Sequence, residues 1–118
     1  MEEHLFALLS DGLDFPVAWG ALGDGVALPR AVLSLTGGRQ DYVLGARGLT
    51  MSRVQVDCYG ATFGSAATAA RSVRGILDGY RGGPVERVLV MMPPTTMPGD
   101  DAGILHRVLT TFAVHHRD

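Results

Sequence analysis

Hydrophobic and polar residues alternate in two different rhythms over residues 50–77, TMSRVQVDCYGATFGSAATAARSVRGIL. In the first part every second residue is apolar, as in a strand that buries one face, because successive side chains of a strand point to opposite sides. The apolar side carries Val54, Val56 and Cys58. The other side carries Arg53, Gln55, Asp57 and Tyr59. The pattern predicts a strand over residues 52–59 with one face in the core and a polar face toward water or another protein.

Beyond Gly60 the apolar spacing changes to every third or fourth residue, which is the period of a helix. The predicted helix covers residues 63–80 and has Thr62 as its N-cap, because a threonine hydroxyl can accept a hydrogen bond from an amide of the first turn. Its predicted buried stripe consists of Phe63, Ala66, Ala67, Ala70, Val73, Ile76, Leu77 and Tyr80. Because the stripe is mostly alanine, we expect this helix to lie close on a sheet.

The N-terminal residues predict a second, short helix. EEHLFALLS places Leu5, Leu8 and Leu9 on one helical face, and Asp11-Gly12 ends the helix. We expect a loop over residues 15–29, interrupted by a short strand at 17–19, and a proline-rich loop at 93–103, whose prolines exclude it from the centre of a sheet.

Further strands are predicted by short apolar or alternating runs. They cover residues 17–19, 31–36, 85–92 and 104–116, the last with Val108, Thr110, Phe112 and Val114 on one side. The glycine-punctuated, polar segment 37–48, GGRQDYVLGARG, is predicted to be a long hairpin arm or a mobile loop, and we expect residues 39–48 to become ordered on assembly. The elements predict a single α+β domain over residues 1–118, a four- to five-stranded mixed or antiparallel sheet with both helices packed on one face.

Charge and cysteine content exclude several classes of function. The net charge of −2 lacks the basic excess of typical nucleic-acid-binding domains. Cys58 is the only cysteine, which excludes an intramolecular disulfide or a multi-cysteine zinc site. No apolar run reaches the roughly 20 residues of a membrane span, and the acidic N-terminus is unlike a signal peptide, so we expect synthesis in the cytoplasm and no membrane contact.

Candidate chemical groups are scattered. His115 and His116 are neighbours in a strand and face opposite ways, while His106 lies about 33 Å from His116 along it. Cys58 has the same parity as Val54 and is expected to be a buried apolar filler without a nearby activating base. The glycine-rich segment 20–25 and the Asp100-Asp101 pair are expected to be turns. We therefore expect no catalytic, cofactor-binding or metal-binding residues, and no enzyme.

The central run GGRQDYVLGARGLTMSRVQVDCYGATFGSAATAARSVRGIL resembles the siphophage tail completion family. These are the tail-to-head joining and tail terminator proteins of long-tailed phages and phage-like particles. The matching positions are Arg39, Asp41, Tyr42, Gly45, the segment 53–59 and the segment 61–63. The N-terminal helix and the last strand stand in the family's usual places. The chain departs from the family in shorter segments at 20–29 and 93–103, and in Gly64-Ser65 where an acidic residue is common.

The resemblance implies a structural virion protein that forms a ring, commonly a hexamer, at the head-proximal end of the tail, in a phage, a prophage or a gene transfer particle. Its implied partners are the major tail tube protein and a head-neck connector or stopper, while DNA passes through without specific binding. We assign the subunit or tail interface to the polar strand face and the arm: Arg39, Asp41, Tyr42, Arg47, Arg53, Gln55, Asp57 and Tyr59. Asp57 is expected to be an exposed charge with little effect on folding. Tail terminator and tail-to-head joiner both remain open.

A different class of protein shares the same predicted elements. A small-ligand-binding, ferredoxin-like regulatory domain is also α+β, and it would show a pocket with a few convergent polar groups. An uncovered polar strand face without such a pocket favours the assembly protein.

Overall fold

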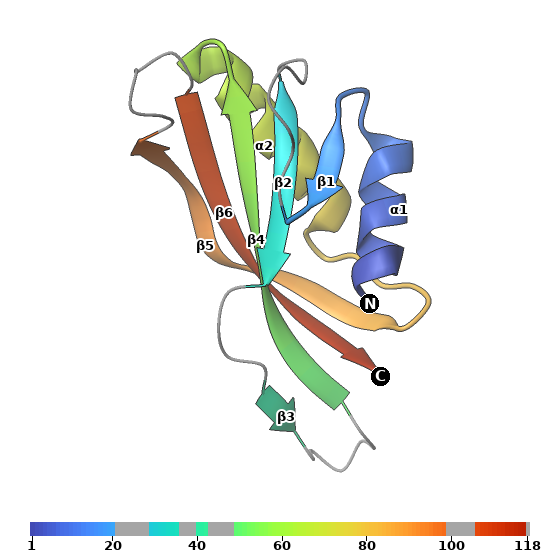
Figure 1. The fold of residues 1–118 in the computed structure, drawn as a ribbon. Helices are drawn as coiled ribbons and strands as arrows, with labels where there is room; N and C mark the ends of the chain where they lie inside the picture. Colours follow the sequence, from blue (N-terminus) through green and yellow to red (C-terminus); the bar gives the residue numbers. More distant parts are fainter. Residues whose placement is uncertain (21–28, 36–39, 43–48, 99–105, 118) are drawn as a thin grey trace.

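The computed structural model describes residues 1–20, 29–35, 40–42, 49–98 and 106–117 (Figure 1). Its two helices are α1, Glu2–Gly12, and α2, Phe63–Leu77. Its strands are β1 (Val17–Trp19), β2 (Arg30–Leu35), β3 (Gln40–Tyr42), β4 (Leu49–Gly60), β5 (Val85–Pro98) and β6 (His106–Arg117).

The strands form one mixed sheet in the order β1-β2-β4-β6-β5, and β3 pairs with β4 beside this path. β1 and β2 run parallel, and the other pairs are antiparallel. The predicted α+β class is confirmed, with six strands where four or five were expected. β3 is the added strand, and it lies within the segment 37–48 that was predicted to be a hairpin arm or a loop.

β5 is longer than predicted and runs through the prolines to Pro98. Proline cannot donate to a strand ladder, but β5 is an edge strand, so one of its sides needs no partner. Its pairing with β6 shifts register between Val90 and Met92 and again between Met92 and Thr95, an interval that contains Pro93 and Pro94. The prediction that this proline-rich segment is not a central strand is confirmed.

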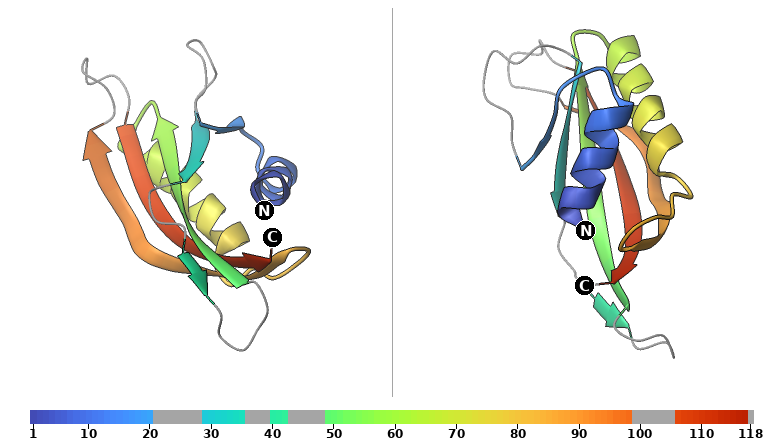
Figure 2. Two further views of the ribbon diagram at one scale, coloured as in Figure 1. Left: turned by 60° about the horizontal axis from the view of Figure 1, so that its bottom comes forward. Right: turned by 90° about the vertical axis from the view of Figure 1, so that its right-hand side faces the viewer.

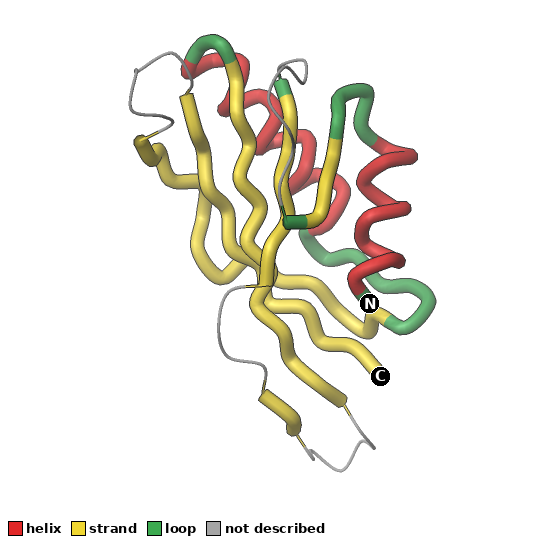
Figure 3. Tube along the Cα trace, viewed as in Figure 1, coloured by secondary structure: helices red, strands yellow, loops and turns green. Residues whose placement is uncertain are grey.

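Both helices pack on the same face of the sheet, as Figures 2 and 3 show. Leu5 and Leu9 of α1 are fully buried in the same core as Val54 and Val56 of β4. α2 contributes small side chains to this core, namely Ala66, Ala69, Ala70 and Val73. Small side chains let the helix axis approach the strands closely, as the alanine-rich stripe predicted. Neither helix in the described ranges is long and apolar enough to span a membrane.

The start of α2 follows the predicted capping geometry. The Thr62 hydroxyl accepts a hydrogen bond of 3.0 Å from the Ser65 amide, which satisfies one of the unpaired donors of the first turn. The prediction that Phe63 belongs to the core is wrong, because its side chain is 51% exposed at the first helical position. The helix ends at Leu77, so Tyr80 lies beyond it rather than within it.

Candidate assembly surface

The sheet has a second face, called here the open face, over which no helix or strand of the described residues lies (Figure 1). The strand registers place alternate residues of four adjacent strands on it. Its members include Arg30, Val32 and Ser34 of β2, Arg53, Gln55, Asp57 and Tyr59 of β4, Arg107, Leu109, Thr111, Ala113 and His115 of β6, and Arg87 and Leu89 of β5. The predicted parity of β4 is thereby confirmed.

Asp57 is the centre of a hydrogen-bonded network on this face. Arg107 donates from Nε to Asp57 Oδ1 over 2.7 Å, and Gln55 donates from Nε2 to Asp57 Oδ2 over 2.8 Å. Both distances are typical of strong, charge-assisted hydrogen bonds. The hydrogen bond to Asp57 raises the pKa of Arg107, and this outweighs the opposing effect of partial burial. Arg107 is therefore held as a cation against the carboxylate.

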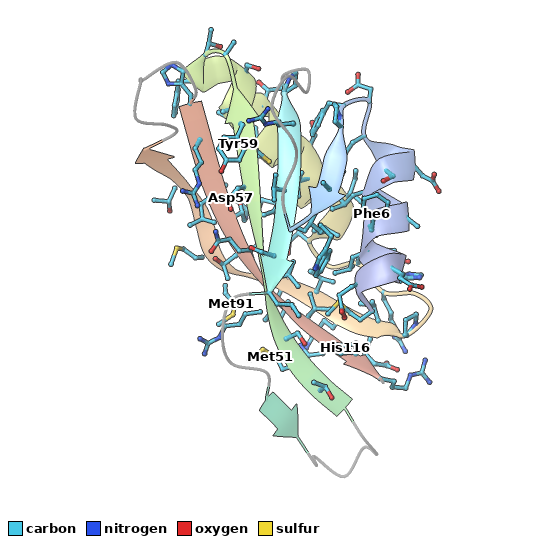
Figure 4. All side chains as sticks on the ribbon, viewed as in Figure 1. Phe6, Met51, Asp57, Tyr59, Met91 and His116 are labelled. Atoms are coloured by element: carbon cyan, nitrogen blue, oxygen red, sulfur yellow. The ribbon has the colours of Figure 1, made fainter. Side chains whose placement is uncertain are left out.

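The expectation that Asp57 is an exposed charge is wrong, since the residue is only 6% exposed. The cause lies in the neighbouring side chains, because Gln55 of β4 and Arg107 of β6 both bind the carboxylate of Asp57, which Figure 4 labels. Asp57 has little contact with water and accepts hydrogen bonds from two donors. Because a buried charge without partners is costly, this carboxylate and its donors contribute to folding as well as to the surface.

Tyr59 lies between two guanidinium groups. Arg30 on β2 and Arg107 on β6 are its direct partners on the adjacent strands, and their guanidinium carbons lie 5.3 and 6.0 Å from the ring centroid. Such cation–π contacts stabilise this arrangement and hold the ring in place at this end of the open face. These contacts link four residues, called here the Asp57 network: Gln55, Asp57, Tyr59 and Arg107.

The other end of the open face is basic and unpaired. Within the described residues Arg53, Arg87 and His115 form no hydrogen bond or ion pair, and the Arg53 Nε and His115 Nδ1 atoms are inaccessible to water and without a partner. His115 pairs with Arg87 on β5 and with Met51 on β4. Among the members of the open face named above, four are arginines (Arg30, Arg53, Arg87 and Arg107) and one is acidic (Asp57), a local excess of positive charge that the whole-chain charge of −2 does not show.

The buried titratable groups have structural partners or are suppressed by burial. Cys58 is 1% exposed, as predicted, and burial raises the pKa of its thiol to about 12, with the neighbouring Asp57 charge adding to the effect. His116 Nε2 lies 2.8 Å from Ser52 Oγ, and His4 Nε2 lies 2.7 Å from the Tyr80 hydroxyl. In the parts of the chain that the structure describes, no group of three histidine, cysteine or acidic residues could hold a metal ion.

The remaining predicted interface residues lie in the arm. Arg39 and Arg47 fall outside the described residues. Asp41 and Tyr42 belong to β3, where they pair with Thr50 and Leu49 of β4. The structure thus joins Asp41 and Tyr42 to the strand that carries the polar face, at its opposite end from the Asp57 network.

Two apolar surfaces were missed by the sequence reasoning. One is a hollow of about 520 Å³ between α1 and β1, lined by Glu2, Glu3, Phe6, Val17, Ala18 and Trp19. The other is a set of exposed side chains on β5, namely Leu89, Met91 and Met92. A signal was available for the first, because Phe6 lies off the helical face defined by Leu5 and Leu9 yet is apolar.

Comparison with known proteins finds structural similarity alone. No protein-family model matches the sequence, and no curated protein does either. Among solved structures, the chain is similar to a chain from the virion of a native gene transfer agent particle. The TM-score is 0.59 at 16% sequence identity, and the match covers 97% of this chain and 84% of that one. At this identity the match shows a common fold, and it runs over nearly the full length of the chain.

Proposed function

We propose that this chain is a structural protein of a phage-like particle, and that it forms a ring at the head-proximal end of the tail. In this role the ring terminates the tail tube and joins it to the head or neck, so its partners are the tail tube protein and a connector or stopper protein. The residues act by forming contact surfaces rather than by catalysis.

The observation that carries the proposal is the near-complete structural match to a chain of a gene transfer agent virion. It coincides with the sequence resemblance to the tail completion family, which depends on residues 37–77 and uses no structural information. The sequence resemblance and the fold match both support a structural protein of a phage-like particle, and the role in the tail rests on the sequence resemblance alone.

The form of the molecule supports an assembly role. A sheet covered by helices on one face leaves polar and apolar groups on the other face and at both edges, where another subunit can pack. Leu89, Met91 and Met92 are each at least 40% exposed, which is typical of a contact surface. By contrast, a ligand-binding domain would use a pocket with convergent polar groups. The hollow beside α1 has mainly apolar walls. A second hollow of about 410 Å³, lined in part by Asp14, Ser65 and Ser72, is the feature that a ligand-binding role would use.

Inactivating the gene in a strain that produces particles tests this function. We expect heads without attached tails, or tails of irregular length, in electron micrographs, and recovery of normal particles when the gene is supplied in trans. Normal particles in normal yield from the inactivated strain would contradict the proposal.

A further inference from the structure

The two missed apolar surfaces lie at opposite edges of one sheet. The hollow belongs to β1 and α1, and β1 is the first strand of the order β1-β2-β4-β6-β5. The exposed apolar side chains belong to β5, the last strand. Figure 4 shows the same separation, with Phe6 on one side of the molecule and Met91 on the other.

The first surface, called here the α1 groove, is apolar with an acidic rim. Phe6 is 40% exposed, and Val17 and Trp19 are partly exposed behind it. Glu2 and Glu3 are exposed at its rim and form no ion pair within the described residues. The groove therefore suits an apolar side chain with a positive charge beside it.

The second surface, called here the β5 patch, has those properties. Leu89, Met91 and Met92 are 40%, 47% and 47% exposed. Arg87 is exposed two residues before Leu89 and has no ion-pair partner among the described residues. Methionine side chains are flexible and adapt to an irregular apolar hollow. An arginine without an ion-pair partner among the described residues thus matches two glutamates, beside the groove, of which the same is true.

We infer that the β5 patch of one copy of this chain docks in the α1 groove of a second copy. Because the two surfaces differ and lie on opposite edges, each subunit that uses its patch leaves its own groove free for a further subunit. Such a head-to-tail contact closes into a ring when the rotation between subunits divides the circle, and otherwise forms a filament. The inference rests on the proposed function for the expectation of a ring, and it adds which surfaces meet. It moves the subunit contact from the polar face of β4 to the two sheet edges.

Charge reversal tests the contact. We compare Glu2→Arg/Glu3→Arg, Arg87→Glu and the three changes combined, with Asp11→Arg and Arg81→Glu as controls that reverse exposed charges outside both surfaces. Native mass and light scattering give the oligomeric state of purified protein, and circular dichroism checks the fold. We expect the wild type and both controls to assemble. Each surface variant should assemble at least about tenfold more weakly, because like charges that face each other oppose association. The combined variant should regain assembly, because its charges are again opposite across the contact.

A mixing experiment tests the head-to-tail geometry by a different readout. A groove variant, Phe6→Glu, keeps its β5 patch, and a patch variant, Met91→Glu, keeps its α1 groove. The patch of the first can therefore dock in the groove of the second, and no functional surface is left for a third subunit. The mixture should give one-to-one dimers and nothing larger. Failure to form mixed dimers from two folded variants would overturn the inference, as would wild-type assembly by either variant or a monomeric wild type at about 100 μM. If the edge variants block assembly but particles form normally without the gene, the inference stands and the proposed virion function fails.

Discussion

Replacing Asp57 by asparagine removes the charge at the centre of the network while keeping the side-chain volume. The carboxylate accepts hydrogen bonds of 2.7 Å from Arg107 and 2.8 Å from Gln55. A hydrogen bond to a charged group contributes about 1.5–3 kcal/mol, and stranding one partner of a fully buried ion pair costs about 3–5 kcal/mol. Because the Arg107 side chain is 25% exposed and can turn toward water, we expect Asp57→Asn to lower the free energy of unfolding by about 1–3 kcal/mol.

Urea denaturation measures this loss, provided that the m-value is unchanged. Asp78→Asn is the matched control, since Asp78 makes the same kind of pair with Arg74 at 3.9 Å but is 44% exposed, and should cost less than about 1 kcal/mol. A double-mutant cycle with Arg107→Met should give a coupling energy of about 1–3 kcal/mol. Stability of Asp57→Asn within about 0.5 kcal/mol of wild type, with no coupling, would refute the structural role of the network.

Three further predictions concern the buried face and α2. Cys58 should resist thiol reagents in the folded protein at pH 8, and rapid labelling of the native thiol would contradict its burial. Because the thiol ionises near 9.0 in the unfolded chain and near 12 in the folded one, the free energy of unfolding should fall by up to about 1.4 kcal/mol per pH unit between pH 9 and 12. The Cys58→Ala variant should lack this pH dependence. Thr62→Ala should lower the free energy of unfolding by about 1 kcal/mol through loss of the cap. Thr68→Ala, an exposed change within the same helix, should raise it slightly in the same denaturation assay, because alanine has the higher helix propensity. Gly60→Ala should lower the free energy of unfolding by more than about 1 kcal/mol, because the new Cβ would lie 2.6 Å from a backbone nitrogen of α2. Gly75→Ala, with open space around the new Cβ, should stabilise the protein. Equal effects at the two glycines would argue against the close contact between β4 and α2.

The local periodicity predicted the elements because it depends on which face of each element meets the core. Val54 and Val56 on β4, and Val108 and Phe112 on β6, are all at most 3% exposed, as their alternation indicates. Phe63 shows the limit of this reasoning. The helical period places it on the buried stripe, but the period does not reveal that the first turn of α2 extends past the residues that could cover it.

The error at Asp57 has a different cause. The alternation of apolar and polar residues correctly placed Asp57 on the face away from the helices. The further assumption that a residue on this face is exposed to water was wrong. Its partner Arg107 is 50 residues away in the sequence, and the contact exists because β6 pairs beside β4. The apolar surfaces at the sheet edges were not predicted for a similar reason. Strand order makes β1 and β5 the two ends of the sheet, and this order depends on how the whole chain folds rather than on local sequence.

The position of the protein in an intact particle tests the central claim most directly. A short epitope tag fused after the C-terminal residue, in a strain whose particles remain infectious, can be labelled with gold-conjugated antibody and located by electron microscopy. The account predicts a single labelled position per particle, at the junction between head and tail. Label along the whole tail or on the capsid surface, or purified particles that lack the protein, would contradict it.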